Sequence, residues 1–267
     1  LLTALLNPGM KQRHWTKLSE VLGFEFALDD EITLHDALAA NLEEKIDQIT
    51  EVVGIASKEY SIEVSLQKMQ SEWEEINLEI EPYKNTGTYV LKGSDDIIQK
   101  LDDDMVMTNT MEFSPYKKPF EERLNRWENT LKLITFVIEE WLACQRQWLA
   151  LEPIFASDDI KKQLPTEAER FATVDKTWRK VLESAYRAPA ALKFCPSEKL
   201  LEDFKQNNKL LGHVQRGLND YLESKRVAFP RFYFLSNDEL LSILSQTKDP
   251  TAVQRHLRRC FENVGSL

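Results

Sequence analysis

Apolar residues recur at every third or fourth position over long stretches of this chain. The clearest stretch runs from Phe120 to Trp148, where successive apolar residues are 4, 3, 4, 3, 4, 3 and 7 positions apart. This period of 3.5 residues is typical of a helix that packs one face against neighbouring helices. Pro119 suits the first turn of such a helix, and Pro153 is expected to end it. We therefore predict one helix of about 30 residues, about 45 Å long at 1.5 Å per residue.

Four further stretches show the same spacing, so the sequence predicts a chain made mostly of long helices. They cover residues 42–56, 62–80, 171–185 and 200–221. Helix starts are indicated where a polar side chain can accept a hydrogen bond from a free backbone N–H group, or where a proline follows it. These signals are the capping boxes Thr166–Glu169 and Ser236–Glu239, and the pair Asp249–Pro250.

Five of the six tryptophans fall on the apolar faces of these stretches. We interpret them as core side chains packed between helices. The alternative is a contact surface, because exposed aromatic residues concentrate binding energy. The five are Trp73, Trp127, Trp141, Trp148 and Trp178.

One segment, residues 81–96, interrupts the helical pattern. It holds Pro82, Gly87 and Gly93 around an apolar run at residues 89–91. This arrangement predicts a small β-hairpin or an extended loop between helices. The predicted fold class is therefore all-α, a multi-helix bundle array with one small β-hairpin insertion.

The interruption divides the chain into predicted parts. Residues 1–82 form an N-terminal helical part, and residues 83–113 form the hairpin, a connector and a short helix. Residues 114–267 form a C-terminal helical part.

Composition and charge narrow the class of protein. Hydrophobic residues make up 42% of the chain and charged residues 29%, which is typical of a folded domain. The net charge is −10, so we expect no nucleic-acid partner, because phosphate binding needs clustered positive charge. No stretch approaches 18 consecutive apolar residues, so no membrane partner is expected either. The three cysteines lack CxxC spacing and are interpreted as reduced thiols of an intracellular protein.

Sequence patterns for catalysis are missing. The chain contains no GxxxxGK[ST], GxGxxG, GxSxG or HExxH pattern. Cys144 is interpreted as an inert thiol on the long helix. We therefore predict no catalytic, cofactor-binding or metal-binding residues. Two acidic clusters are interpreted as solvated helix faces, with metal ligation as the alternative; they are Glu72, Glu74, Glu75, Glu79 and Glu81, and Asp102, Asp103 and Asp104.

Residues 225–262 combine large aromatic side chains with positive charge. Between Lys225 and Cys260 there are seven Lys or Arg residues and three Asp or Glu residues. Pro230 does not fit a helix interior. One interpretation is a packed connector between helices; the other is a docking element for an acidic partner domain. The aromatic segment, here called the wedge, consists of Phe229, Pro230, Arg231, Phe232, Tyr233, Phe234 and Leu235.

This stretch closely resembles the linker region of dynein heavy chains, just upstream of their ring of AAA+ modules. The phrase FLSNDELLSILSQTKDP within it is more similar to axonemal than to cytoplasmic dyneins. One departure is Arg255, where the family pattern has proline. The resemblance extends nearly end to end through WLACQRQWLALEPIFASDDIKKQLPTEAERFATVDKTW (141–178), SPYKKPFEERLNRWENTL (114–131), YVLKGSDDIIQKLDDDMV (89–106) and NPGMKQRHW (7–15).

The resemblance implies an elongated helical lever that arches over the ATPase ring of the same chain and bends and straightens as the motor moves. ATP and Mg²⁺ are then expected in AAA+ modules elsewhere in the parent chain, with the first P-loop beyond Leu267. Microtubules are reached only through distal parts of the parent. Intermediate and light chains bind through the upstream tail, and the location is the cytoskeleton of a ciliary or flagellar axoneme.

Within that implied lever, local composition indicates where it flexes. The candidate hinge is either the segment 83–94 or the break at 114–119, and the wedge is the candidate contact with the ring. The main alternative is a non-motor helical scaffold, and an unfamiliar enzyme is a third interpretation. The candidate hinge residues are Tyr83, Gly87, Gly93, Ser114, Pro115 and Pro119.

Overall fold

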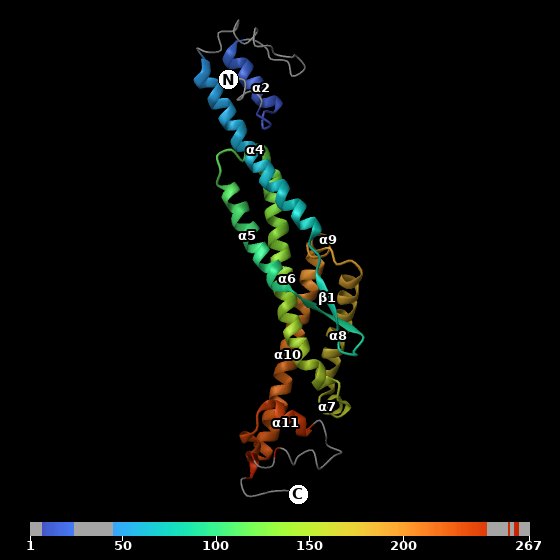
Figure 1. Cartoon of the computed structure of the whole chain (residues 1–267). Helices are drawn as coiled ribbons and strands as arrows, with labels where there is room; N and C mark the ends of the chain where they lie inside the picture. The colour runs from blue at the N-terminus through green and yellow to red at the C-terminus, as the bar shows by residue number, and fades with distance from the viewer. Residues whose placement is uncertain (1–6, 24–44, 245–255, 257–258, 262–267) are drawn as a thin grey trace. The chain divides into compact units, whose positions relative to one another are not determined.

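The computed structural model describes residues 7–23, 45–244, 256 and 259–261 (Figure 1). The chain divides into two compact units. Unit 1 consists of Leu1–Ile76 and Ile98–Leu131, and unit 2 of Asn77–Ile97 and Lys132–Leu267. The described residues form long helices and an antiparallel hairpin. The predicted all-α class with a hairpin insertion is therefore confirmed.

The units are not consecutive along the chain, because helices α5 (Ser94–Glu112) and α6 (Glu121–Phe155) each contribute residues to both. The three predicted parts, in contrast, follow one another in sequence. That division concerns mechanical parts and stays a prediction.

Unit 1 is built on α4 (Ile46–Glu75), a helix of 30 residues. It unites two stretches predicted as separate, residues 42–56 and 62–80; residues 42–44 lie outside the described part. The second stretch was predicted too long: the helix ends at Glu75, and Ile80 belongs to a strand. Ile80 keeps the apolar spacing of the helix although it lies in the strand, so spacing alone did not mark the boundary.

The short helix α2 (Gln12–Leu22) packs on the N-terminal part of α4. Two polar contacts fix its start, since Glu59 of α4 pairs with both Arg13 and His14. The apolar cluster between the two helices consists of Leu18, Leu22, Ile49, Val52 and Val53.

At its other end, α4 joins α5 through a polar network centred on the buried Asp104. The indole Nε1 of Trp73 donates to Asp104 Oδ2 at 2.6 Å. Lys100 bridges Asp104 Oδ1 at 3.1 Å and Glu72 Oε2 at 2.5 Å. Burial opposes the charge of Lys100, but its hydrogen bonds to Glu72 and Asp104 raise its pKa overall. The interpretation of Asp102–Asp104 as a solvated face is therefore wrong for Asp104, which is buried against another helix.

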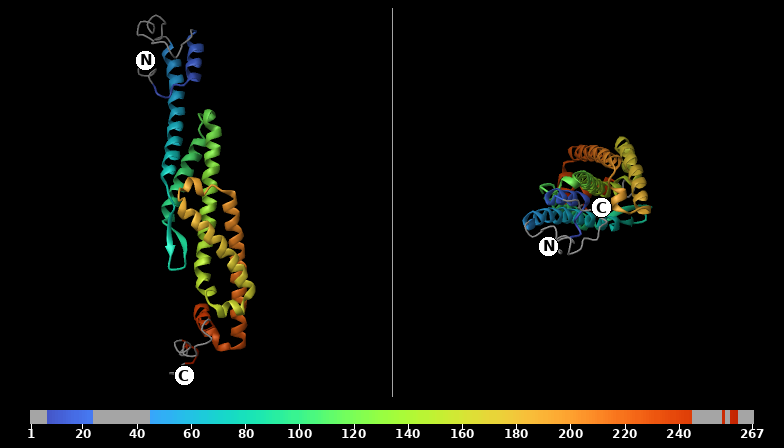
Figure 2. Two further views of the ribbon diagram at one scale, coloured as in Figure 1. Left: turned by 90° about the vertical axis from the view of Figure 1, so that its right-hand side faces the viewer. Right: turned by 90° about the horizontal axis from the view of Figure 1, so that it is seen from above.

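Unit 2 combines the remainder of α6 with the hairpin and a set of helices that follow it. Figure 2 shows α8 and α10 side by side, and they make extensive contact. The elements are β1 (Glu79–Tyr83), β2 (Thr88–Lys92), α7 (Asp158–Gln163), α8 (Pro165–Arg187), α9 (Ala191–Phe194), α10 (Glu198–Ala228), the 3₁₀ helix η3 (Pro230–Phe234) and α11 (Asn237–Leu244).

The hairpin strands pair antiparallel, with Ile80 opposite Leu91 and Tyr83 opposite Thr88. The turn between them uses left-handed backbone at Lys84 (φ 47°) and Gly87 (φ 70°). Glycine adopts this conformation without a Cβ clash, which explains its position at the turn.

Two side chains attach the hairpin to the helices. The Gln145 amide of α6 accepts from Leu91 N at 2.8 Å and donates to Leu91 O at 2.9 Å. The guanidinium of Arg179 on α8, which lies beside the hairpin (Figure 1), donates to the carbonyl of Thr86 at 2.7 Å. Gln145 therefore pairs with the open edge of β2 as a further strand would.

Stacked aromatic rings fill the space between α6, α8 and α10. Trp148 stacks on Trp178 with ring centroids 5.3 Å apart, and Trp141 stacks on Phe204 at 5.2 Å. Trp178 meets Phe204 edge-on at 6.5 Å. All four rings are fully buried.

Helix ends differ from the sequence expectations at two places. Pro153 does not end α6, which continues to Phe155. The residue after the helix keeps its bond, since Ala156 N donates to Glu152 O at 2.9 Å. Thr166 is not an N-cap, because α8 begins at Pro165, whose fixed φ suits the first helical position.

The second capping box is confirmed. Ser236 N donates to Glu239 Oε2 at 2.9 Å, and Glu239 N donates to Ser236 Oγ at 3.3 Å. The pair Asp249–Pro250 lies outside the described residues.

The link between α6 and the hairpin generates a stability prediction. Gln145→Leu should lower the free energy of unfolding by about 1–3 kcal/mol, because the buried Leu91 loses partners for both backbone groups. Gln147→Leu is the matched control on the same helix, since its bonds of 3.3–3.4 Å are weaker. Urea unfolding and amide exchange at Leu91 measure the effect. Equal losses in the two variants would contradict the role assigned to Gln145.

Candidate functional site

The wedge lies between α10 and α11 of unit 2. Helix α10 ends at Ala228, and the chain passes through η3 before Ser236 caps α11. Pro230 explains this change, because it has no N–H group to continue the α-helical hydrogen bonds. A short 3₁₀ turn therefore presents the aromatic side chains between two helix ends.

Most wedge side chains face solvent. The exposed fraction is 40% for Phe229, 55% for Tyr233 and 68% for Phe234. Phe232 is half-buried and meets Phe229 edge-on at 4.7 Å. Leu235 is only 4% exposed and anchors the segment in the core. Leu235 thus acts as a packed connector, while the aromatic rings form an apolar surface.

Two arginines hold the wedge in place. Arg231 Nη1 donates to Cys260 O at 2.8 Å, and its guanidinium lies 4.6 Å from the Phe261 ring centre. Arg226 Nη2 donates to Leu235 O at 3.2 Å and to Asn237 Oδ1 at 2.7 Å. Their charges are therefore engaged in organising this segment. Other basic residues of the stretch, such as Lys248 and Arg255, lie outside the described part.

Tyr233 is the wedge residue with an acidic neighbour. Its hydroxyl donates to Glu223 Oε1 on α10 at 2.5 Å. This hydrogen bond is the main reason why the pKa of Tyr233 is raised. The ring is thereby oriented while it remains exposed.

The candidate hinge residues of the hairpin all belong to unit 2. Tyr83 meets the Trp148 ring edge-on at 5.4 Å. Gly87 has the left-handed backbone of the turn, and Gly93 (φ 57°) precedes α5. A Cβ at Gly93 would collide with the carboxylate of Glu79. Tyr83 and Gly93 are therefore held by packing and close contacts, whereas a Cβ at Gly87 would meet open space.

The other candidate hinge residues belong to unit 1. Ser114 N donates to Met111 O at 3.1 Å directly after α5. Pro115 lies in the turn that follows, and Pro119 lies in the 3₁₀ helix η2 (Lys118–Phe120). Phe120 is buried, so η2 is anchored in its unit.

None of the six candidates lies where the chain passes between the units. The hairpin candidates and the wedge belong to unit 2, and the candidates at 114–119 belong to unit 1. Hinge motion at these residues stays a prediction. The passages between the units are at Ile76–Asn77, Ile97–Ile98 and Leu131–Lys132.

The five tryptophans of the helical stretches are all buried. Two of them donate to carboxylates on neighbouring helices, Trp73 to Asp104 and Trp148 to Asp175. Sequence reasoning missed both partners, because each lies 27 or more positions away.

The cysteine thiols are free and buried. Burial raises the pKa of both Cys144 and Cys195 to about 12. Since the thiolate is the reactive form, these thiols are poor nucleophiles at neutral pH. In the described part of the chain, no group of three His, Cys, Asp or Glu side chains is placed to hold a metal ion. No helix there is long and apolar enough to cross a membrane.

The whole chain, residues 1–267, matches the family model described as "Dynein heavy chain, N-terminal region 2". This chain belongs to the dynein heavy chain family. The sequence resemblance to that family is thereby confirmed.

Curated relatives of this dynein segment include axonemal heavy chains. It is 53% identical over its full length to "Dynein axonemal heavy chain 1" of Mus musculus and 52% identical to that of Homo sapiens. It is 44% identical over 97% of its length to "Dynein axonemal heavy chain 12" of Homo sapiens. The chain spans 6% of the length of the first two relatives and 8% of the third.

Two neighbouring residues of the wedge, Phe234 and Leu235, differ in burial and therefore test which part of the wedge is surface and which is core. Phe234→Ala should change the free energy of unfolding by less than about 0.5 kcal/mol, because its side chain is mostly in water. Leu235→Ala should lower it by about 2–5 kcal/mol, because it empties a buried position. Urea unfolding compares the variants. A cost at Phe234 as large as that at Leu235 would show that the wedge is core.

Proposed function

We propose that this chain is part of the linker of an axonemal dynein heavy chain and acts there as a mechanical lever. The lever bends and straightens over the AAA+ ring of the same heavy chain, in the cytoskeleton of a cilium or flagellum. The observation that carries the proposal is the family match over all 267 residues. The names of the relatives support the axonemal location.

The internal construction of each unit supports a force-bearing role. Helices α4, α6 and α10 have 30, 35 and 31 residues. At 1.5 Å per residue, α6 alone extends about 50 Å. Side-chain bonds tie α4 to α5 through Trp73 and Asp104 in unit 1. In unit 2 they tie α6 to the hairpin through Gln145 and α8 to the hairpin through Arg179. Such bracing resists bending between the tied elements.

The chemistry that drives the lever belongs, in this proposal, to other parts of the heavy chain. AAA+ modules beyond these residues bind ATP with Mg²⁺ and hydrolyse it. Distal parts of the heavy chain bind the microtubule, and the upstream tail binds intermediate and light chains. The wedge contributes the contact with the ring, for which its exposed aromatic rings are suited.

Cross-links in the complete heavy chain test the candidate hinges. Cysteines replacing the stacked Tyr89 and Tyr186 would fix the hairpin to α8 after reaction with a short bismaleimide. Cysteines replacing Glu112 and Lys117, which form an ion pair at 2.7 Å, would span the break after α5. Cross-linking at the true hinge should abolish microtubule gliding and spare basal ATPase activity. The buried Cys144 and Cys195 should react slowly, because their pKa values are about 12.

The control is a cysteine pair at Glu167 and Gly217, which are in close contact within unit 2. This cross-link joins α8 to α10 and should leave gliding intact. Unchanged gliding with either test pair would remove that segment as a hinge. Unchanged gliding with both would leave neither candidate.

Substitution of the wedge tests its contact with the ring. Phe234→Ala in the complete heavy chain should remove most of the nucleotide-dependent change in lever position, because an exposed anchor is lost. Energy transfer between fluorophores on lever and ring measures that position. Arg231→Glu and Tyr233→Ala should act in the same direction, with folding checked by circular dichroism because both residues also bond within the chain.

Phe136→Ala provides the matched control, since Phe136 is an exposed aromatic residue on α6 outside the wedge. It should leave the coupling unchanged. If Arg231→Glu and Tyr233→Ala simply unfold and Phe234→Ala has no effect, the wedge is only a packed connector. A wild-type lever that does not respond to nucleotide would favour the scaffold function.

A further inference from the structure

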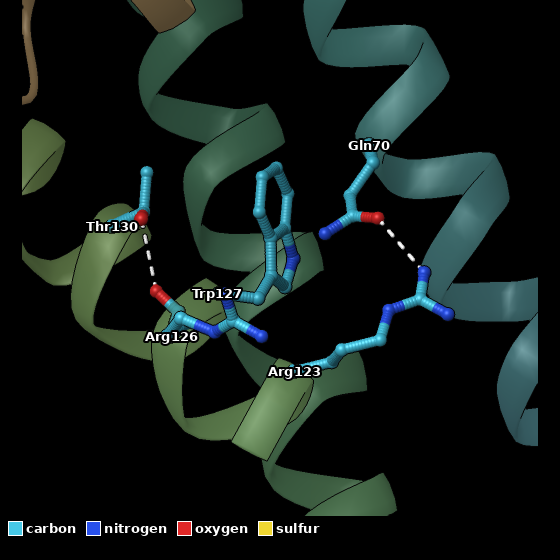
Figure 3. A pocket seen from close by; sticks show the side chains of 5 residues that line it. All are labelled: Gln70, Arg123, Arg126, Trp127 and Thr130. Carbon is cyan, nitrogen blue, oxygen red and sulfur yellow. Dashed lines mark hydrogen bonds between the residues drawn. The ribbon is translucent and has the colours of Figure 1, made fainter. Parts of the chain in front are cut away.

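A pocket of about 300 Å³ lies within unit 1, between α4 and α6 (Figure 3). Gln70 lines it from α4, and four residues line it from α6. Their spacing of three and four positions places them on one face of that helix. The α6 residues are Arg123, Arg126, Trp127 and Thr130.

The pocket lining is rich in hydrogen-bond donors. Arg123 Nη2 donates to Gln70 Oε1 at 3.1 Å, so the oxygen of that amide already accepts one hydrogen bond. Arg126 Nε donates a hydrogen bond to the backbone carbonyl of Glu122 at 3.3 Å. Among the described residues, neither guanidinium forms an ion pair with a carboxylate, and no lining residue is acidic. Two positive charges thus face the pocket without a compensating negative charge in its lining.

Trp127 supplies an independent signal for a ligand. It is 4% exposed, and its Nε1 has no hydrogen-bond partner in the described part of the chain. Figure 3 draws this nitrogen on the edge of the ring nearer to Gln70. A buried donor without a partner costs about 1–3 kcal/mol, which an acceptor entering the pocket would recover. Trp73 and Trp148 satisfy the same group with an aspartate. The Nε1 atoms of Trp141 and Trp178 also lack a partner in the described part of the chain, but only Trp127 among these three lines this pocket.

We propose that this pocket binds the carboxylate of an Asp or Glu side chain from a polypeptide segment outside residues 1–267. A carboxylate has two acceptor oxygens, which match the planar donors of a guanidinium and can also accept from the indole. The site does not involve the wedge, so it is independent of the proposed contact with the ring.

The surroundings favour a carboxylate over a phosphate. Glu121 and Glu122 occupy the first turn of α6 next to Arg123, and they repel a dianion more strongly than a monoanion. No glycine lines the pocket, so it lacks the backbone cradle of common phosphate sites. A polypeptide source is favoured because relatives extend far beyond the matched region, which is 6–8% of their length.

Zero-length cross-linking in the complete heavy chain tests the proposal. Arg126→Lys keeps the positive charge and introduces a primary amine, which a water-soluble carbodiimide joins to a carboxylate in direct contact. Mass spectrometry should then identify a peptide containing Asp or Glu from outside residues 1–267, joined to position 126. Adding Arg123→Gln should lower the cross-link yield about tenfold, as expected for the loss of one charge-assisted hydrogen bond.

Arg146→Lys is the matched control, because Arg146 is exposed on the same helix and lies outside the pocket. It should give no cross-link to the same peptide. Absence of a cross-link at position 126, or cross-links only to residues within 1–267, would overturn the proposal. So would suppression of the reaction by inorganic phosphate without capture of any polypeptide carboxylate, since the pocket would then be a site for small oxyanions.

Discussion

The side chain of Trp148 holds together the elements on which unit 2 depends. Its ring stacks on Trp178 of α8 and receives the edge of Tyr83 from the hairpin. Its N–H donates to Asp175 Oδ1 at 3.1 Å, and Asp175 Oδ2 accepts from Arg179 at 2.7 Å. Arg179 then reaches the hairpin turn. One residue of α6 thereby fixes both the adjacent helix and the inserted strands, and the aromatic core extends from it.

Unit 1 uses the same chemistry at a different place. Trp73 donates to Asp104, and Lys100 shares that carboxylate with Glu72. A buried carboxylate is costly unless its oxygens are bonded. The indole and the ammonium together occupy both oxygens of Asp104, so the cost is offset. In each unit a tryptophan contributes apolar area through its ring and a directional contact through its nitrogen.

The sequence was a good guide to whatever depends on local spacing. The helical stretch after Phe120, the hairpin around Gly87 and the cap at Ser236 follow from periodicity, turn residues and capping chemistry. The sequence was a poor guide where the role of a side chain depends on a partner far away along the chain. Gln145 stands in the seven-residue gap between Trp141 and Trp148, and spacing does not reveal its role, because its partner Leu91 is 54 positions away.

In the wedge, too, the helix end could be predicted from local sequence, whereas the burial and hydrogen-bond partners of its side chains could not. Pro230 predicted the end of a helix, and α10 ends at Ala228. Spacing could not show that Leu235 is buried while Phe234 is exposed, since 3₁₀ geometry replaces the usual helical period. Nor could charge counting show that Arg226 and Arg231 are occupied by backbone carbonyls of their own segment.

Glycine and proline indicate a flexible joint only where tertiary contacts leave the backbone free. At the hairpin turn, bending must break the charge-assisted bond from Arg179 to Thr86 and separate Tyr83 from Trp148. An unbroken helix such as α6, in contrast, curves gently without losing any backbone hydrogen bond. Local stability follows the density of buried contacts more closely than it follows residue type. In a braced helical array, the place that yields under load is therefore decided by which side chains tie the elements together, and composition alone does not reveal it.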